Sequence, residues 1–213
     1  MIVELALDPL VLGAASEPSL RAPGLREEDR AAVEACQHGE REAFGRLVER
    51  YQRDVYRLCY RYVNNHHDAN DMAQEVFLKA YRALGKFRGE SAFSTWLYRI
   101  AVNTCLNFRA ARRPDAEPLH DSLPDSGPGA GAGVLTRERE RLVREAVSRL
   151  PDKQRTTVIL KIYQELTHEE VAVIVGSSVG TVKANLFHAM NNLRKQLAGG
   201  ALDSASRARQ GEA

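Results

Sequence analysis

The segment THEEVAVIVGSSVGTVKANLFHAMNNL, residues 167–193, decides the fold class because two helical patterns of apolar residues meet in it at a short turn. Thr167 and Glu170 have the spacing of a capping box, so a first helix is predicted to start there. Gly176 follows the apolar face of this helix, where a left-handed residue ends many helices, and the two serines after it are candidates to cap a second helix. Two helices joined in this way form the helix-turn-helix pattern.

The second helix of this motif has an apolar side and a polar side. Its apolar positions recur every three or four residues and are Val182, Leu186, Ala189, Leu193 and Leu197. The other side holds Thr181, Lys183, Ala184, Asn185, Phe187 and His188. In a helix-turn-helix the second helix enters the major groove of DNA, where Asn pairs with adenine and Lys with guanine or a phosphate. An ordinary helical hairpin is the alternative. DNA binding is favoured because the polar side opens at the helix start, where the dipole attracts phosphate.

Composition divides the chain of 213 residues into two helical lobes. Helical periodicity covers residues 27–113 and 135–198, which are predicted to be two domains, and no segment shows the alternation typical of a strand. Residues 114–134 are rich in Pro, Gly and Ser, carry several Asp and Glu, and are predicted to be an acidic linker. Residues 1–26 are predicted to be a flexible N-terminal extension, and residues 199–213 a flexible tail. The predicted fold class is therefore all-α.

Bulk composition excludes several classes of protein. The net charge is only +2, so any contact with nucleic acid must be confined to local basic patches. No run approaches the ~20 apolar residues of a membrane-spanning helix, and the N-terminal segment lacks the basic start of a signal peptide. We therefore expect a cytoplasmic protein without membrane insertion. Cys36, Cys59 and Cys105 are far apart and are predicted to be reduced core thiols.

One cluster has the residue types of a metal site: His66, His67, Asp68 and Asp71. Adjacent histidines point apart on a helix, and no second cluster in the sequence completes a coordination shell, so we expect no metal and no cofactor. No catalytic triad or phosphate-binding glycine loop stands out, and an enzyme is not expected. A helical enzyme with a site at residues 66–71 is an alternative that predicts metal in the purified protein.

The stretch DANDMAQEVFLKAYRAL, residues 68–84, is predicted to be an amphipathic helix. Its apolar face is expected to be buried and holds Ala73, Val76, Phe77, Ala80, Tyr81 and Leu84. The opposite face carries Asp71, Gln74, Glu75 and Leu78. A leucine among acids and an amide on an exposed face indicates a protein-binding patch, because it otherwise leaves apolar area in water. A lone surface leucine is the alternative.

The next stretch, KFRGESAFSTWLYRIAVNTCLNFRAARR at residues 86–113, combines aromatic, basic and amide side chains. One helical face, predicted to be core, holds Phe93, Trp96, Leu97, Ile100, Ala101, Thr104 and Phe108. The other side offers Tyr98, Arg99, Asn103, Arg109, Arg112 and Arg113. Aromatics interleaved with Arg and Asn, preceded by the polar loop at residues 88–94, are typical of single-stranded nucleic-acid binding, where bases stack on rings and cations follow the backbone.

Four stretches together resemble the extracytoplasmic-function sigma factors of bacterial RNA polymerase. They are AFGRLVERYQRDVYRLCYRYV at 43–63, DANDMAQEVFLKAYRAL at 68–84, FSTWLYRIAVN at 93–103 and LPDKQRTTVILKIYQELTHEEVAVIVGSSVGTVKANL at 150–186. The resemblance covers roughly residues 27–197, in the family's order and with its linker. It implies a helical region-2 domain, a helical region-4 domain and a non-catalytic role in transcription initiation.

The resemblance also assigns roles to residues. Core polymerase, through its β′ clamp helices, is implied to bind Asp68, Asp71, Gln74, Glu75 and Leu78. Melting of the minus-ten element, with capture of a flipped base, is implied for Lys86, Phe87, Arg88, Ser91, Phe93, Ser94, Thr95, Trp96, Tyr98, Arg99 and Asn103. Recognition of the minus-thirty-five element is implied for Thr167, Ser178, Thr181, Val182, Lys183, Asn185 and His188.

Further partners implied by the resemblance are promoter DNA, the β flap of core polymerase and an anti-sigma factor. The acidic run at residues 115–125 is implied to mimic RNA. Many relatives carry Ser and Arg where this chain has Ala184 and Asn185, and Arg is frequent at the position of His188. The alternative function is a stand-alone helix-turn-helix regulator, which predicts operator binding without polymerase, usually as a dimer.

Overall fold

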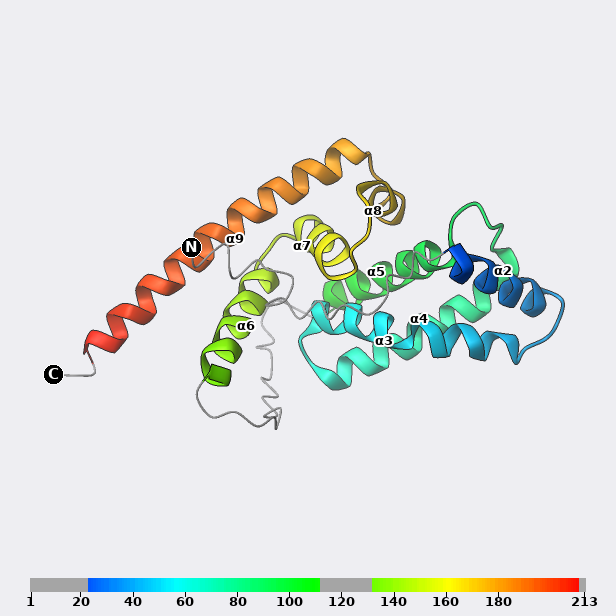
Figure 1. The fold of residues 1–213 in the computed structure, drawn as a ribbon, viewed down its shortest axis with the longest axis horizontal. Coiled ribbons are helices and arrows are strands. Elements are labelled where there is room, and N and C mark those ends of the chain that lie inside the picture. Colours follow the sequence, from blue (N-terminus) through cyan, green and yellow to red (C-terminus); the bar gives the residue numbers. More distant parts are fainter. Residues whose placement is uncertain (1–22, 112–131, 211–213) are drawn as a thin grey trace. The chain divides into compact units, whose positions relative to one another are not determined.

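The computed structural model describes the backbone of residues 23–111 and 132–210 and the side chains of residues 27–111 and 139–198 (Figure 1). Within these ranges every regular element is a helix. In chain order they are α2 (Pro23–Gln37), α3 (Ala43–Val63), α4 (His66–Ala83), the 3-10 helix η1 (Leu84–Lys86), α5 (Phe93–Ala111), α6 (Ala132–Ser148), α7 (Asp152–Val158), the π-helix η2 (Ile159–Tyr163), α8 (His168–Val175) and α9 (Val179–Gln210). The predicted all-α fold is confirmed. Most of the predicted N-terminal extension and linker lies outside the described residues.

The described residues form two compact units. The first holds α2 to α5 and most of α8, and the second holds α6, α7, η2 and α9. Two helical units agree with the prediction of two domains, while the predicted domain boundaries stay predictions.

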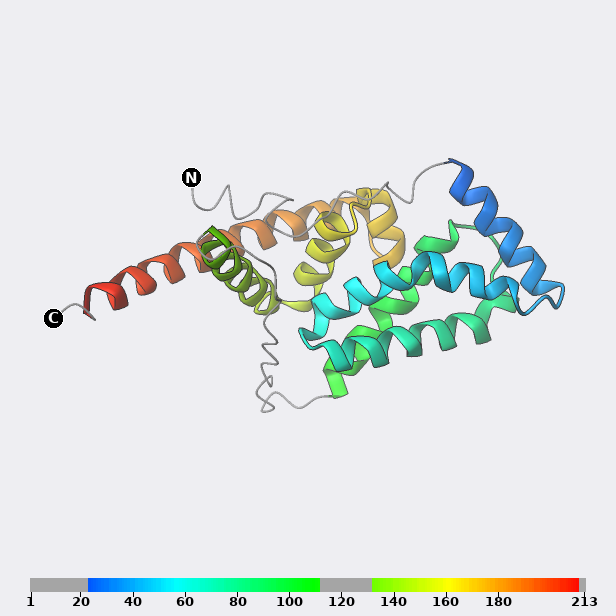
Figure 2. The same ribbon diagram turned by 60° about the horizontal axis from the view of Figure 1, so that its bottom comes forward.

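In the first unit α3, α4 and α5 pack side by side, and α2 packs against α3 (Figures 1 and 2). The fully buried side chains of this core include Leu47, Tyr51, Val55, Leu58, Val76, Leu97 and Tyr98. Each aliphatic side chain buried in this way contributes about 1.5–3 kcal/mol to folding. The buried face of α4 is made largely of alanines, Ala69, Ala73 and Ala80, which let its backbone approach its neighbours closely.

Two consecutive asparagines separate α3 from α4. Asn64 caps the C-terminus of α3 in the left-handed region, at φ 57°, and donates its backbone N–H to the carbonyl of Tyr60. Asn65 caps α4, because its side-chain oxygen accepts the backbone N–H of Asp68 at 2.9 Å. Asparagine is among the residues that tolerate the first geometry and favour the second, so this joint is fixed locally.

The buried thiol pair, Cys59 of α3 and Cys105 of α5, lies inside the first unit. Both side chains are buried and free, with their Sγ atoms 3.9 Å apart, and burial raises the pKa of Cys105 well above its ordinary value. Cys36 is free and half-buried. The prediction of core thiols is therefore confirmed for the buried thiol pair, while Cys36 lies at the edge of the core.

The second unit is built on α6, α7 and α9. Its core contains Val143, Ala146, Val147, Leu150, Val158, Ala189 and Leu193. Arg155 of α7 is 2% exposed and donates to the carbonyls of Val147 at 3.1 Å and Leu150 at 3.5 Å. The buried guanidinium thus bonds one carbonyl in the last turn of α6 and one just after the helix, and the Val147 carbonyl also accepts the backbone N–H of Leu150 at 3.2 Å.

Helix α9 is longer than predicted. It runs through Gly199 and Gly200 to Gln210, where the sequence pattern predicts a flexible tail from residue 199. Each glycine costs a helix only about 1 kcal/mol relative to alanine, and the alanines and arginines around them favour the helix, so the glycine pair does not end it. Helix α2 likewise begins at Pro23, a residue that suits the first turn of a helix.

Among the described residues, no single helix combines the length and apolarity needed to cross a membrane. The bent pair formed by α8 and α9 meets these limits jointly, by length and composition alone.

Candidate functional site

An aromatic cluster stands at the start of α5 in the first unit. The ring centroids of Phe87 and Trp96 are 5.0 Å apart, those of Phe93 and Trp96 are 5.7 Å apart, and those of Phe87 and Phe93 are 6.1 Å apart. Phe93 is 4% exposed and also contacts Tyr51 of α3, at 5.5 Å. Phe93 therefore anchors the cluster in the core, while Phe87 and Trp96 are half-buried and keep part of their surface in solvent.

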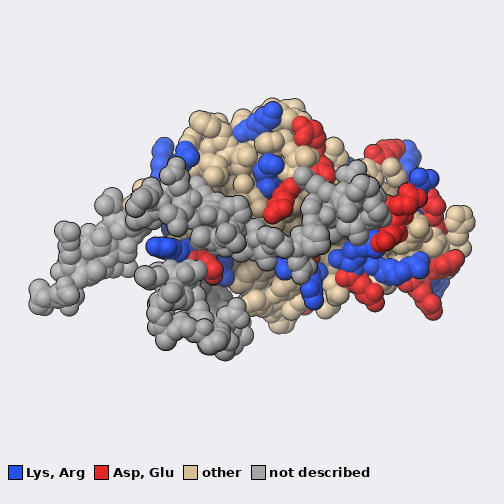
Figure 3. Space-filling model, viewed as in Figure 1, with Lys and Arg blue, Asp and Glu red and all other residues tan. Residues whose placement is uncertain are grey.

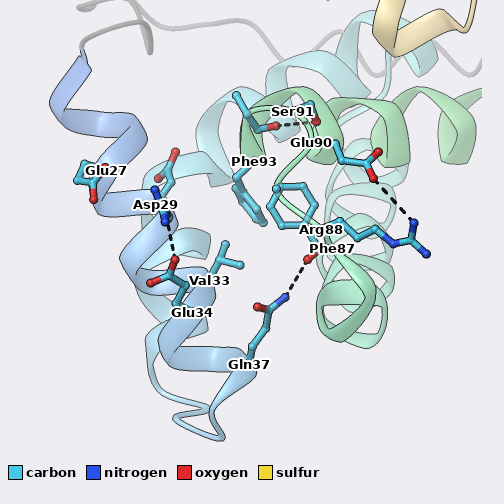
Figure 4. Close-up of a pocket in the computed structure, with 13 residues that line it drawn as sticks. Glu27, Asp29, Val33, Glu34, Gln37, Phe87, Arg88, Glu90, Ser91 and Phe93 are labelled. Carbon is cyan, nitrogen blue, oxygen red and sulfur yellow. Dashed lines mark hydrogen bonds and ion pairs between the residues drawn. The ribbon is translucent and has the colours of Figure 1, made fainter.

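A pocket of about 610 Å³ lies beside this cluster, between α2 and the segment that precedes α5 (Figure 4). It is lined by Glu27, Asp29, Arg30, Val33, Glu34, Gln37, Phe87, Arg88, Gly89, Glu90, Ser91, Ala92 and Phe93. Its two guanidinium groups are paired with carboxylates, Arg30 with Glu34 at 2.9 Å and Arg88 with Glu90 at 3.9 Å. Figure 3 shows acidic and basic side chains intermixed over this end of the molecule. The lining therefore disfavours a phosphate group inside the pocket and fits a neutral polar group better.

Buried hydrogen bonds hold the α2 wall of the pocket in place. Asp29, 5% exposed, accepts hydrogen bonds from Arg50 Nη1 at 2.5 Å and from the hydroxyl of Tyr51. Burial, reinforced by the bond to Asp29, raises the pKa of Tyr51 well above its ordinary value. The same Arg50 also donates to the exposed carboxylate of Glu28. Because Tyr51 contacts Phe93, this network links α2 to the aromatic cluster through α3.

Gln37, the last residue of α2, contacts the opposite wall. Its Nε2 donates to the carbonyl of Leu84 at 3.0 Å and to the carbonyl of Phe87 at 2.9 Å. The second of these bonds is drawn in Figure 4. No sequence signal identifies Gln37, since an exposed glutamine at the end of an amphipathic helix is ordinary and its partners lie 47 and 50 residues away.

The residues predicted to contact minus-ten DNA differ in exposure. Lys86, Arg88, Arg99 and Asn103 are exposed, and Phe87, Ser91, Ser94 and Trp96 are half-buried. The rings of Tyr98 and Phe93 and the hydroxyl of Thr95 lie in the core, at 1%, 4% and 6% exposure, and their contact with DNA stays a prediction. Helix α5 packs against both α3 and α4, so its buried side is displaced from the face predicted by its periodicity: Thr95, Tyr98 and Val102 are buried. Trp96, Ile100 and Phe108 of the predicted core face are only half-buried. Burial raises the pKa of Tyr98 well above its ordinary value, in agreement with a core position.

The α4 surface, formed by Asp71, Gln74, Glu75, Leu78 and Tyr81, faces solvent. Leu78 is 50% exposed, as predicted. Tyr81 is 42% exposed, so its predicted burial is wrong; its ring packs edge-on against Phe44 of α3 at 5.1 Å instead of entering the core. The α4 surface thus has two apolar side chains one turn apart, beside carboxylates that pair with His67 and Lys79. Asp68 is half-buried at the start of this helix.

Among the described residues, no group of three or more His, Cys, Asp or Glu side chains is arranged to hold a metal ion. His66 instead stacks on Tyr60 at 4.6 Å, and its ring nitrogen hydrogen-bonds the hydroxyl of Tyr56. His67 pairs with Asp71 at 3.0 Å. The two histidines at the start of α4 therefore contact aromatic and carboxylate groups of the protein.

The turn between α8 and α9 has the geometry predicted from residues 167–193. Gly176 is left-handed, at φ +64°, and directly follows the last residue of α8, Val175. Ser178 caps α9, since its Oγ accepts the backbone N–H of Thr181 at 3.1 Å. Helix α8 begins at His168, directly after Thr167, which is half-buried.

The start of α9 exposes most of the side chains predicted to contact minus-thirty-five DNA. Thr181, Lys183 and His188 are exposed, and Asn185 is half-buried. Val182 is fully buried and belongs to the core, and its contact with DNA stays a prediction. Phe187 is 64% exposed and its ring contacts His188, which adds an apolar group to this polar side.

Comparison with known proteins agrees with this architecture. The family model "Sigma-70 region 2" matches residues 47–114, and "Sigma-70, region 4" matches residues 140–193. The RNA polymerase sigma-H factor of Pseudomonas aeruginosa is 39% identical over 183 residues, which covers 81% of this chain and 95% of that protein. The ECF RNA polymerase sigma-E factor of Haemophilus influenzae is 39% identical over 183 residues, 79% and 95% of the two chains. The sigma factor RpoE from Bartonella quintana, solved in complex with the anti-sigma factor NepR, shares the fold with a TM-score of 0.56 at 20% identity, covering 74% of this chain and 98% of that chain.

Proposed function

This chain belongs to the extracytoplasmic-function (ECF) family of RNA polymerase sigma factors, which are non-enzymatic transcription initiation factors, and we propose that it directs core polymerase to one class of promoter by contacting both promoter elements. The observation that supports this most directly is the pocket beside the aromatic cluster in the first unit, in a chain that also carries a helix-turn-helix.

The minus-ten element is proposed to bind as a single strand at this pocket. A base taken out of the stack loses a few kcal/mol of stacking and pairing, which the site must offset. Stacking on an aromatic ring returns about 1–3 kcal/mol per base, and the half-buried rings of Phe87 and Trp96 are available for it. The pocket accepts the extruded base, because a base is neutral and the pocket is lined by carboxylates. Arg88, which is exposed at the pocket lining, and exposed Arg99, which also donates to the carbonyl of Val173, are proposed to contact the phosphates.

The minus-thirty-five element is proposed to bind the start of α9 in the major groove. Thr181 and Lys183 lie on its exposed side, within the first turns, where base edges and phosphates are reached. Asn185 is half-buried and presents an amide that can pair with adenine. His188 extends the same side by one turn. Each bidentate base contact made here discriminates by about 1–3 kcal/mol.

The α4 surface is proposed to bind the β′ clamp helices of core polymerase. Its two exposed apolar side chains, Leu78 and Tyr81, supply the apolar centre of an interface, and the carboxylates of Asp71 and Glu75 supply its polar rim. The β flap and an anti-sigma factor are proposed as further partners. The anti-sigma proposal is supported by the RpoE structure, which holds NepR.

The test is transcription from genomic DNA fragments by core polymerase, with and without the full chain. Discrete start sites that require the chain are expected, and alignment of the DNA upstream of them gives the promoter sequence. Sequence-specific DNA binding by the chain alone, without a polymerase complex, would instead establish the stand-alone regulator. Metal in the purified protein together with neither activity would favour an enzyme.

A further inference from the structure

The segment that carries Phe87 has little regular structure of its own. Residues 88–92 belong to no helix, and Gly89 has a left-handed backbone at φ +71°. The position of this segment therefore depends on the groups that hold its two ends. At its C-terminal end α5 begins, and Phe93 is fixed in the core.

At the N-terminal end the anchor comes from α2. The carboxamide of Gln37 donates to the carbonyl of Leu84, the first residue of η1, at 3.0 Å and to the carbonyl of Phe87, directly after η1, at 2.9 Å. The backbone N–H of Phe87 also donates to the carbonyl of Leu84, at 3.0 Å. One side chain of α2 therefore ties both ends of the turn that precedes Phe87 to the α2 wall of the pocket. Figure 4 draws the bond to Phe87.

We propose that Gln37 is a positioning residue for the base-binding segment: it fixes the distance between α2 and the Phe87 backbone, and so the width of the pocket that receives the flipped base. This rests on the proposed minus-ten function. Gln37 acts through Phe87 and the segment behind it and need not touch DNA itself. It is not among the residues that the sequence pattern or the family resemblance points to.

The test compares the full chain with Gln37→Met, which keeps the length of the side chain and its helix propensity but removes the donor. The probe is the non-template minus-ten strand of a promoter mapped by the transcription experiment, bound to holoenzyme. An abasic site is moved through the strand one position at a time. For the wild type, one position is expected to lose most affinity, and the ratio of intact to abasic affinity there measures base capture.

In Gln37→Met this ratio is expected to fall about tenfold, the factor that corresponds to two hydrogen bonds of ordinary net strength. Affinity for core polymerase and for the strand that is abasic at that position should stay unchanged. A merely structural role would weaken all of these together. The matched control is Gln52→Met in α3, because within the described part of the chain the Gln52 amide bonds the carbonyl of Glu49 in its own helix and no other segment.

Each outcome decides between the two proposals. A ratio in Gln37→Met equal to that of the wild type overturns the positioning role and leaves base capture intact. A wild type that binds intact and abasic strands equally overturns base capture and the positioning role with it. If Gln37→Met does not fold, Gln37→Asn decides, since its amide is one methylene too short to reach both carbonyls; a wild-type ratio there overturns the proposal.

Discussion

Asp29 and Glu28 are neighbouring carboxylates that bind the same arginine in very different surroundings, and they allow a matched test of how the pocket wall is held. Asp29 is buried and accepts hydrogen bonds from Arg50 and Tyr51. The Glu28 side chain is 63% exposed. We predict that Asp29→Ala destabilises the first unit strongly and that Glu28→Ala does not.

The magnitude follows from what each substitution leaves behind. Asp29→Ala removes a charge-assisted bond and leaves the Tyr51 hydroxyl, in a side chain that is 1% exposed, without its acceptor. Losing a hydrogen bond to a charged group costs about 1.5–3 kcal/mol and leaving a buried hydroxyl unpaired about 1–3 kcal/mol, so the expected loss is about 3 kcal/mol. Glu28→Ala removes an exposed ion pair, which costs about 0–1 kcal/mol. Tyr51→Phe removes the hydroxyl that bonds Asp29 and leaves the carboxylate its bond from Arg50, so it should cost only about 1 kcal/mol.

The assay is urea unfolding followed by the fluorescence of Trp96. This is the single tryptophan of the chain, and it lies in the first unit, so its signal reports that unit. The quantity compared is the free energy of unfolding in water. Equal losses in Asp29→Ala and Glu28→Ala, or a loss below about 1 kcal/mol in Asp29→Ala, would refute the argument that burial makes this contact strong.

Three further predictions concern other surfaces. Leu78→Arg should abolish binding to core polymerase in a pull-down while the far-UV circular dichroism stays that of the wild type; unchanged affinity would count against the α4 surface. Replacing Lys183 and Asn185 by Ala should reduce transcription from the native promoter at least tenfold without changing polymerase affinity, and wild-type transcription would remove these residues from promoter recognition. Cys36 should be the first thiol to react with iodoacetamide, and it should react slowly because burial raises its pKa and so lowers the thiolate fraction at pH 8. The buried thiol pair should react only in urea. Equal reaction rates for all three thiols, measured by mass spectrometry, would contradict the burial pattern.

Features that depend on neighbouring residues could be predicted from the sequence. The turn before α9 is the clearest case, because a left-handed Gly176 and a capping Ser178 act within a few residues of themselves. The exposed Leu78 is another, since one helical period is enough to separate it from the core. The all-α fold follows from the same periodicity.

Features that depend on packing between distant segments could not be predicted from the sequence. Tyr98 is buried because two helices cover α5, and Tyr81 is exposed because Phe44 holds it at the surface. The pocket and Gln37 join segments about fifty residues apart, so no local pattern identifies them. The length of α9 depends on helix propensity across Gly199 and Gly200, where a glycine pair normally predicts an end.

Under the proposed minus-ten function, the aromatic cluster sets a threshold for opening DNA. In the free protein Phe87, Phe93 and Trp96 already contact one another, and such pairs contribute about 0.5–1.5 kcal/mol beyond their burial. A base that stacks here exchanges part of that contact for a contact of about 1–3 kcal/mol, so one base alone gains at most about 2.5 kcal/mol, which does not exceed the few kcal/mol that extruding it costs. Opening then becomes favourable only when several bases are captured at once. A promoter whose strand offers all of these contacts is opened cooperatively, and one that offers a single contact stays closed.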